Sequence, residues 1–360
     1  MIDSISEHFS SRLLQWYGQH GRKTLPWKMD SDPYRIWVSE IMLQQTQVAT
    51  VIPYFERFMQ RFPTVQAVAS APQDDVLGLW AGLGYYARGR NLHKAACVIV
   101  DQHGGVFPTC IEDVAALPGI GPSTAGAILS LAFDQRHAIL DGNVKRVLAR
   151  VFSIAGYTGS SQNMKLLWQR AEQLTPQQQA GDYTQAIMDL GAMVCVRSRP
   201  LCPACPVQTM CRANREATTN LYPMPKPKKQ RPFRSRFFIL AQDETQRIAL
   251  VKRPSHGIWG GLWCVPEFED RKELENWCNT VGLVVSSTGR ELQSFVHKFS
   301  HYDLQINPLL VSVENVSKGR IAETDELHFY TYRQLREIGL PAPISKLLES
   351  LELVHEEQTQ

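Results

Sequence analysis

Hydrophobic positions in the first 220 residues recur every three to four residues, and strict alternation of apolar and polar positions is rare. This spacing is typical of amphipathic helices, so we expect residues 1–220 to be almost entirely helical. Helix-start and helix-stop residues predict three helices in particular: one that Pro33 opens with Asp32 as its cap, one that Gly104 and Gly105 close, and one that Asp141 caps and that ends at Gly156.

The pattern changes after residue 220. Residues 222–236 (YPMPKPKKQRPFRSR) contain four prolines and six Lys or Arg, which predicts an extended interdomain linker over 221–235. Such a stretch could also lie along a polyanion. Beyond it we expect an α+β domain over 236–356, with strands at 236–242 and 247–253, a helix at 270–283, a strand running into a helix at 327–335, a helix at 341–353 and a disordered tail from His355.

Composition adds limits to this outline. A chain of 360 residues with 44% hydrophobic and 20% charged residues is typical of a soluble protein of about two domains. The net charge is only +3, so any basic surface must be local. No apolar run reaches the ~18 residues of a membrane span, and the N-terminus lacks the features of a signal or transit peptide. We therefore expect a cytoplasmic protein without a membrane partner.

Four of the eight cysteines lie close together, at Cys195, Cys202, Cys205 and Cys211. In a protein without a secretory signal, such a cluster indicates a metal site more often than disulfides. Zinc would accept four thiolates, but its ribbons usually carry two C-x2-C pairs. Iron–sulfur clusters take four cysteines at varied spacing, so the single C-x2-C favours a 4Fe–4S cluster.

The stretch LPGIGPSTAGAI brackets Ile120 between Gly119 and Gly121, directly before Pro122 and an apolar run. Two interpretations are open. The turn could be a plain joint between helices, or its exposed backbone N–H groups and the helix that follows could bind an anion such as a phosphate.

The hairpin turn, Asp141 twenty residues after Gly121, and the cysteine spacing occur together. In this combination residues 1–220 resemble the helix–hairpin–helix DNA glycosylases that carry an iron–sulfur loop. More narrowly, LPW (25–27), VSEIMLQQTQV (38–48) and GLGYYARGRNLH (82–93) resemble the MutY-type adenine glycosylases, which remove adenine mispaired with 8-oxoguanine. The resemblance implies a monomer that acts on duplex DNA containing A:8-oxoguanine or A:G mispairs, near the nucleoid, with one 4Fe–4S cluster.

Glu40 and Asp141 match the catalytic carboxyls of this family. In a continuous helix, Glu40 would flank an apolar stripe formed by Trp37, Ile41, Gln44, Val48 and Phe55, where partial desolvation raises a carboxyl pKa. From the residues alone, a boundary residue turned to water is the favoured interpretation of Glu40, and the resemblance reverses it. The resemblance implies that Glu40 protonates the base and then activates water, and that Asp141 stabilises the sugar cation or attacks it. Asn143 matches a residue that orients the site, although a helix-capping turn would explain it equally well.

The resemblance also implies DNA contacts. Gly119 and Gly121 correspond to the phosphate-binding turn, and Gln45 and Tyr85, more than their neighbours Gln44 and Tyr86, correspond to residues that enter the duplex. Ser123 stands where related lyases carry a lysine that forms a Schiff base. We therefore expect base excision without efficient strand cleavage, and at most a weak side reaction at Lys145.

The stretch GIWGGLWCVPEFE (257–269) resembles the start of a Nudix fold. The glutamate-rich run that binds magnesium in Nudix hydrolases does not follow it, so pyrophosphate hydrolysis is not expected. Phe299, Ser300 and His301 match the loop with which the family's C-terminal domain reads the oxidised guanine. Without the resemblance they would be ordinary residues of a hairpin turn.

Two other functions remain open. One is an endonuclease III-like glycosylase and lyase acting on oxidised pyrimidines, against which Ser123 and the second domain argue. The other is a DNA-binding scaffold without activity, against which the matching contexts of Glu40 and Asp141 argue. Repair and replication proteins are expected as further partners, without a recognisable docking motif.

Overall fold

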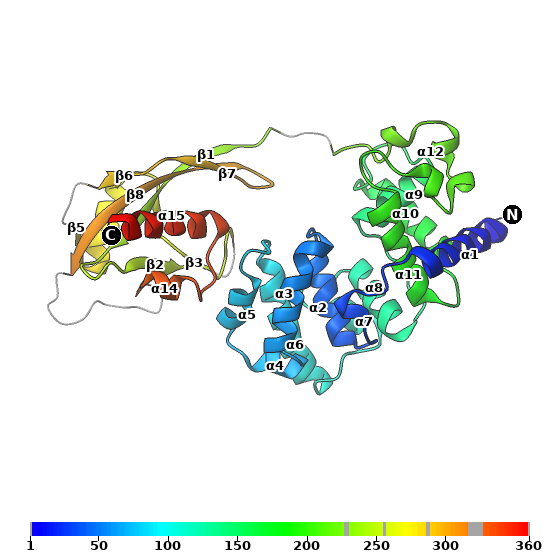
Figure 1. Cartoon of the computed structure of the whole chain (residues 1–360), viewed down its shortest axis with the longest axis horizontal. Coiled ribbons are helices and arrows are strands. Elements are labelled where there is room, and N and C mark those ends of the chain that lie inside the picture. The colour runs from blue at the N-terminus through cyan, green and yellow to red at the C-terminus, as the bar shows by residue number, and fades with distance from the viewer. Residues whose placement is uncertain (1, 227–229, 255–256, 286–288, 316–326, 359–360) are drawn as a thin grey trace. The chain divides into compact units, whose positions relative to one another are not determined.

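The computed structural model describes residues 2–226, 230–254, 257–285, 289–315 and 327–358. The chain divides into two compact units. The first comprises Met1–Ser70 and Asn91–Lys228, and the second comprises Ala71–Arg90 and Lys229–Gln360. Most helices and strands of both units are labelled in Figure 1.

The first unit is helical, as the hydrophobic spacing predicts. Its helices are α1 (Ile2–His20), α2 (Pro33–Leu43), α3 (Val48–Arg61), α4 (Val65–Ser70), α6 (Ala87–His103, which begins in the second unit), α7 (Ile111–Ala116), α8 (Pro122–Phe133), α9 (Gly142–Val151), α10 (Ser161–Leu174), α11 (Ala180–Asp189) and α12 (Arg212–Arg215). Short 3-10 or π turns lie at Pro26–Lys28, Leu190–Val194, Cys202–Ala204, Gln208–Met210 and Thr219–Leu221.

The predicted helix starts are confirmed. Asp32 caps α2 by accepting from the Tyr34 backbone N–H, and Asp141 caps α9 by accepting from that of Val144 at 2.7 Å. A side-chain oxygen at this position satisfies a backbone donor that the first helical turn leaves free.

Two predicted helix lengths are wrong. The stripe through Phe55 assumed one continuous helix, but α2 ends at Leu43 because Gln45 adopts a left-handed backbone (φ 59°) that a helix cannot contain. The α9 helix ends at Val151 rather than at Gly156, since Ser153 is left-handed as well (φ 49°).

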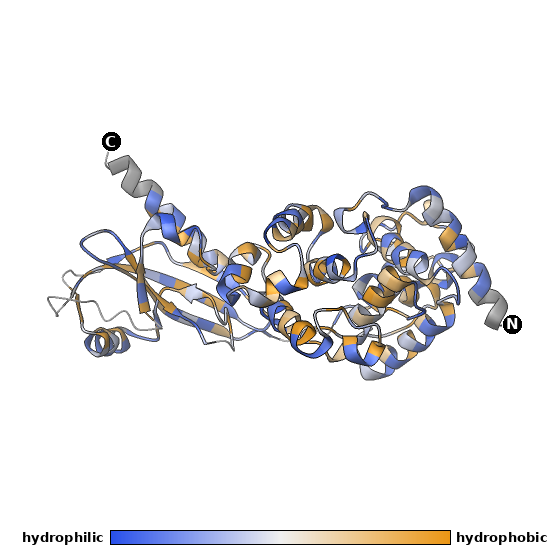
Figure 2. Cartoon of the chain, turned by 90° about the horizontal axis from the view of Figure 1, so that it is seen from below, coloured by the Kyte–Doolittle hydropathy of each residue, from blue (hydrophilic) through white to orange (hydrophobic). Residues whose placement is uncertain are grey.

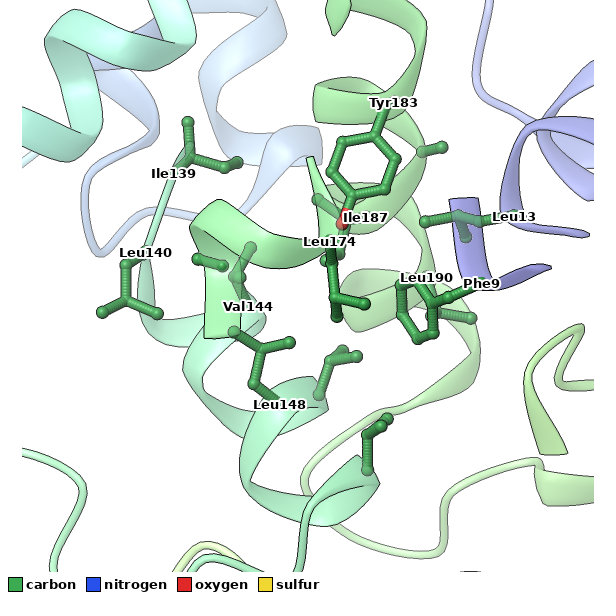
Figure 3. Close-up of a cluster of buried hydrophobic side chains, with 14 of the residues drawn as sticks. Phe9, Leu13, Ile139, Leu140, Val144, Leu148, Leu174, Tyr183, Ile187 and Leu190 are labelled. Carbon is green, nitrogen blue, oxygen red and sulfur yellow. The ribbon is translucent and has the colours of Figure 1, made fainter. Parts of the chain in front are cut away.

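One hydrophobic cluster holds α1, α9, α10 and α11 together. Figure 3 shows Phe9 and Leu13 of α1 near Leu174, Ile187 and Leu190, with Val144 and Leu148 of α9 on the other side. The residues of this cluster are buried to more than nine-tenths. The helix that Asp141 caps is therefore fixed by close packing, which gives the carboxyl a defined position.

The second unit contains a mixed sheet. Its strands are β1 (Phe233–Gln242), β2 (Ile248–Lys252), β3 (Trp263–Cys264), β4 (Glu267–Phe268), β5 (Leu283–Val285), β6 (Arg290–Glu291), β7 (Phe295–Lys298), β8 (Asp303–Asn315) and β9 (Leu327–Tyr330). The main path runs β3-β2-β1-β8-β5, and β1 and β8 are parallel in register from Phe233↔Asp303 to Gln242↔Ser312.

Alternation along β1 builds two cores. Phe238 and Leu240 face the cluster that contains residues of α15 (Ala342–Gln358), whereas Ile239 and Ala241 face the cluster that contains residues of α13 (Arg271–Val281). Successive strand side chains point to opposite faces, so a strand between two helical layers must be hydrophobic on both. Figure 2 shows the mixture of hydrophobic and hydrophilic positions along the outer helices.

The α+β prediction is confirmed, with shifted boundaries. The strand expected from residue 236 begins at Phe233, because it pairs with β8 from that residue onward. The tail expected to be disordered from His355 is helical as far as Gln358, and residues 359–360 lie outside the described part. The short helices α5 (Gln73–Trp80) and α14 (Tyr332–Leu335) complete this unit. No helix in the described ranges is long and apolar enough to cross a membrane.

Candidate active site

Glu40 lies near the end of α2, a helix that is buried on most sides. Its neighbours Val38, Ser39, Ile41 and Met42 are all buried, while Glu40 itself keeps partial exposure. Burial raises the pKa of the Glu40 carboxyl to about 7, and the negative charge of Asp141 adds to this effect. Glu40 is thus protonated in a large share of molecules at neutral pH, as a general acid requires.

Asp141 lies at the N-terminus of α9, where helix dipole and free N–H groups favour an anion. Burial raises its pKa, but several groups oppose that effect: the backbone N–H groups of Val144 and Asn143, and the positive charges of Arg146 and Lys145. These groups stabilise the carboxylate form. Burial still leaves the pKa of Asp141 raised, but Glu40 receives no such support, so the two carboxyls lie in unequal environments.

This arrangement suits cleavage of a glycosidic bond. Such reactions need one carboxyl to protonate the leaving group and another to stabilise positive charge on the sugar, and the protein separates their pKa values by environment. The structure brings Glu40 and Asp141 close enough for one charge to act on the other.

Asn143 lies in the first turn of α9, two residues after the cap Asp141. Its Oδ1 accepts from Nη2 of Arg146 at 2.8 Å, and the same nitrogen donates to the Gly191 carbonyl at 2.7 Å. A Cβ on Gly191 would lie 2.7 Å from the Cβ of Asn143, so only glycine permits this close packing. Asn143 is therefore held against the turn that precedes the cysteine loop.

The cysteine loop is attached to α9 by two arginines. Nε of Arg146 donates to the Cys195 carbonyl at 2.8 Å. Arg150, which is buried, donates to the Cys195 sulfur at 3.3 Å and to the Val196 carbonyl at 2.7 Å. The α9 helix thus has Asp141 at its N-terminus, and arginines in its later turns form hydrogen bonds with the cysteine loop.

The four cysteines of the loop are free thiols in one electrostatic neighbourhood. The charge of Cys195 acts on Cys202, Cys205 and Cys211, and burial raises the pKa of Cys205 to about 12. No ready cluster of three or more metal-ligating side chains exists among the residues described. The four cysteines nevertheless fit an iron–sulfur group as its ligands. All four thiols lie on one loop, and a cationic centre would favour their ionised, thiolate form. The guanidinium groups of Arg146 and Arg150 lie beside them.

The fold requires glycine at one of the two hairpin positions, Gly119 and Gly121, but not at the other. Gly119 has a left-handed backbone (φ 80°), and a Cβ there would lie 2.7 Å from the Cβ of Asn91. Gly121, the residue before α8, has an ordinary backbone and open space where its Cβ would be. Nothing within the described fold requires glycine at position 121, whereas a ligand that approaches the backbone closely would.

Ser123 has a structural partner. Its hydroxyl oxygen accepts from the backbone N–H of Leu140 at 2.8 Å. Ser123 therefore fixes the backbone directly before Asp141.

Two exposed residues share an unusual backbone. Gln45 and Tyr85 are exposed and left-handed, with φ of 59° and 50°. Their neighbours differ: Gln44 is partly buried, with its amide 3.5 Å from the Thr124 hydroxyl, and Tyr86 is only 8% exposed. Exposed non-glycine residues in strained backbone are candidates for a functional role.

Phe299, Ser300 and His301 lie at the turn between β7 and β8. Phe299 is partly buried and its ring lies 5.3 Å from Trp259 and 4.6 Å from His297, while Ser300 and His301 are exposed, with the Ser300 hydroxyl 3.4 Å from Nδ1 of His301. The aromatic residues hold the turn so that its two polar side chains face solvent.

Sequence reasoning missed Arg146 and Arg150. A signal for Arg150 is present, because the other residues of the run from Val147 to Val151 are buried and hydrophobic. A charged residue at a buried position is rare unless it is paired, so this run alone could have suggested a buried partner.

Comparison with known proteins finds two family matches along the chain. Residues 38–173 match the HhH-GPD superfamily of base excision DNA repair proteins, and residues 236–350 match the NUDIX domain. A thermostable thymine-DNA glycosylase is similar in structure, with a TM-score of 0.52 and 28% identity over 59% of this chain and 97% of that one.

The curated relatives extend over most of the sequence. The adenine DNA glycosylase of Buchnera aphidicola subsp. Schizaphis graminum is 40% identical over 95% of this chain and 98% of its own length. The human adenine DNA glycosylase is 38% identical over 82% of this chain and 65% of its own length. Since the Buchnera relative is 40% identical and matches almost end to end, this chain belongs to the adenine DNA glycosylase family.

Proposed function

We propose that this adenine DNA glycosylase removes adenine paired with 8-oxoguanine or guanine and leaves the DNA strand uncut. The observation that carries the proposal is the pair of carboxyls with unequal environments. Burial and the Asp141 charge raise the pKa of Glu40 to about 7, whereas N–H groups and cations around Asp141 oppose the effect of its burial and favour its carboxylate form.

The proposed reaction uses Glu40 in its protonated form and Asp141 as a carboxylate. The target adenine leaves the base stack, because its bond to the sugar is inaccessible inside a duplex. Protonated Glu40 gives its proton to the base, and the electron pair of the bond between C1′ and the base nitrogen departs with it. The Asp141 carboxylate stabilises the cationic sugar electrostatically. Glu40, now ionised, accepts a proton from the water that adds to C1′.

Asn143 serves this step as a positioning residue. Its bond to Arg146 fixes the first turn of α9, from which the backbone N–H groups reach Asp141. We propose that this turn holds the carboxylate toward the sugar.

Duplex DNA is the proposed partner of the exposed features in each unit. In the first unit, Gly119 and Gly121 precede the N-terminus of α8, which suits a phosphate, and Gln45 is exposed beside α2. In the second unit, Tyr85 enters the base stack, and Ser300 and His301 supply polar groups that read the oxidised guanine.

The cysteines would hold one 4Fe–4S cluster. Cys195, Cys202, Cys205 and Cys211 would ligate it through thiolates, and Arg150 would offset their negative charge. The cluster would fix the loop, which also carries the exposed residues Arg197 and Arg199 and is followed by Arg212; these arginines would meet DNA phosphates.

Absence of strand cleavage is proposed from Ser123. A hydroxyl cannot form the Schiff base that breaks the strand, and this one is engaged with Leu140. Lys145 lies in the first turn of α9 and would account for any weak side reaction. A monomeric state, a cytoplasmic location and repair or replication partners stay predictions.

One assay tests the proposal against its rivals. A labelled duplex with adenine opposite 8-oxoguanine is incubated with the protein, and half of each sample is then heated in alkali. Breaks that appear only after alkali are the expected result. Breaks without alkali at oxidised pyrimidines would instead show a lyase of the endonuclease III type, and binding without breaks would show a scaffold.

A further inference from the structure

The loop that carries Tyr85 has an unusually strained backbone. Gly82, Gly84 and Tyr85 are left-handed, with φ of 94°, 71° and 50°. Glycine tolerates this conformation, but a tyrosine is strained in it. The Tyr85 side chain is nonetheless 57% exposed, so no packing of its own ring explains why it stays there.

A buried arginine, Arg88, contacts the backbone of this loop. Arg88 is only 9% exposed, and its Nη2 donates to the Leu83 carbonyl at 3.2 Å and to the Gly84 carbonyl at 3.1 Å. Its guanidinium lies 5.6 Å from the Tyr85 ring centre and equally far from that of Trp80. Burial lowers the pKa of Arg88 to about 10, so the side chain is charged at neutral pH.

Hydrogen bonds from Trp80 and Tyr86 also hold this loop. The Trp80 indole N–H also donates to the Gly84 carbonyl, at 3.3 Å. On the inner side, the Tyr86 hydroxyl donates to the Leu340 carbonyl at 3.0 Å and accepts from the Gly82 backbone N–H at 3.4 Å. The Arg88 guanidinium contacts both the carbonyls of Leu83 and Gly84 and the exposed ring of Tyr85.

We propose that Arg88 is a positioning residue that holds Tyr85 in its strained, exposed conformation for insertion into the mispaired duplex. The inference rests on the proposed function, in which Tyr85 contacts DNA. Arg88 is buried, so we assign it a role through Tyr85 and not a DNA contact of its own.

The geometry of arginine explains why this residue type is used. A guanidinium is planar, so it can donate in its plane to two carbonyls while its face or edge meets aromatic rings. A lysine offers a single ammonium without this shape. Without Arg88, the left-handed state of Tyr85 would become a minor conformer, and the apparent affinity for DNA would fall by the fraction that remains competent.

The test is a double-mutant cycle in the full-length protein with its cluster. Affinity for a duplex containing adenine opposite 8-oxoguanine is measured for the wild type, Arg88→Met, Tyr85→Ala and the double variant, using a non-cleavable adenosine analogue. Arg57→Met is the matched control, because that exposed arginine lies 4.6 Å from the Tyr54 ring on α3. Excision at saturating enzyme is measured in parallel.

We expect Arg88→Met to weaken binding about tenfold, to leave the excision rate at saturation unchanged, and to have no further effect once Tyr85 is alanine. Arg88→Lys should fall in between, and it replaces Arg88→Met in the cycle if the latter does not fold. Independent, multiplying effects of the two substitutions would overturn the inference. If Tyr85→Ala alone binds like the wild type, the proposed DNA contact of Tyr85 fails instead.

Discussion

Glu40→Gln should make the protein more stable and inactive at the same time. The pKa of Glu40 rises from 4.5 to about 7 through burial and the Asp141 charge, and each pH unit is worth about 1.4 kcal/mol. Ionising Glu40 in the folded protein therefore costs at most about 3 kcal/mol. Because the residue is partly exposed, solvent screening reduces this cost to about 1–2 kcal/mol.

The pH dependence has a definite direction. Below pH 4.5 the carboxyl is protonated in both the folded and the unfolded chain, and it costs nothing. Between pH 4.5 and about 7 the folded protein holds a proton that the unfolded chain has lost, so this group lowers the stability as the pH rises through that range. Above pH 7 the full cost remains.

Thermal unfolding of cluster-loaded protein at pH 8 and near pH 5 measures the effect. Glu40→Gln should melt higher than the wild type at pH 8, by about 2–4 °C for each kcal/mol gained, with a smaller gain near pH 5. Excision should fall by about 10²–10⁴-fold, as expected for loss of a general acid. Glu56→Gln, an exposed carboxyl on α3, is the matched control. An unchanged melting point at pH 8 would refute the desolvation argument.

Three further predictions follow from the same unit. Asp141→Asn should abolish excision but keep DNA binding and most of the stability, since Asn also caps helices; unchanged turnover would contradict the assigned role. Gly119→Ala should lower the free energy of unfolding by about 1–3 kcal/mol, whereas Gly121→Ala should cost no stability and weaken DNA binding, and an equal affinity for DNA would show that no phosphate approaches there. Arg150→Met should destabilise the loop and lower the bound iron, measured by visible absorbance, because several loop carbonyls lose their donor; full iron content would contradict this.

Much of the site could be predicted because it depends on short-range chemistry. The cap at Asp141, the left-handed turn at Gly119 and the four grouped thiols each follow from neighbouring residues, since caps, turns and loop cysteines act within a few positions. The periodic spacing also predicted the helical and the α+β regions correctly, although a left-handed Gln45 interrupts what looked like one helix.

Only the tertiary structure decided which residues are desolvated or strained. The resemblance favoured Tyr85 over Tyr86, but nothing in the two adjacent tyrosines themselves showed that Tyr85 is exposed and that Tyr86 is buried, with its hydroxyl bonded to the Leu340 carbonyl. Nor could the sequence show that residues 71–90 pack with the C-terminal unit, which requires contacts across more than 160 positions. The sequence by itself determined the chemistry available to this protein. The fold set the state of each group, because burial, charge and strain at one residue depend on others far along the chain.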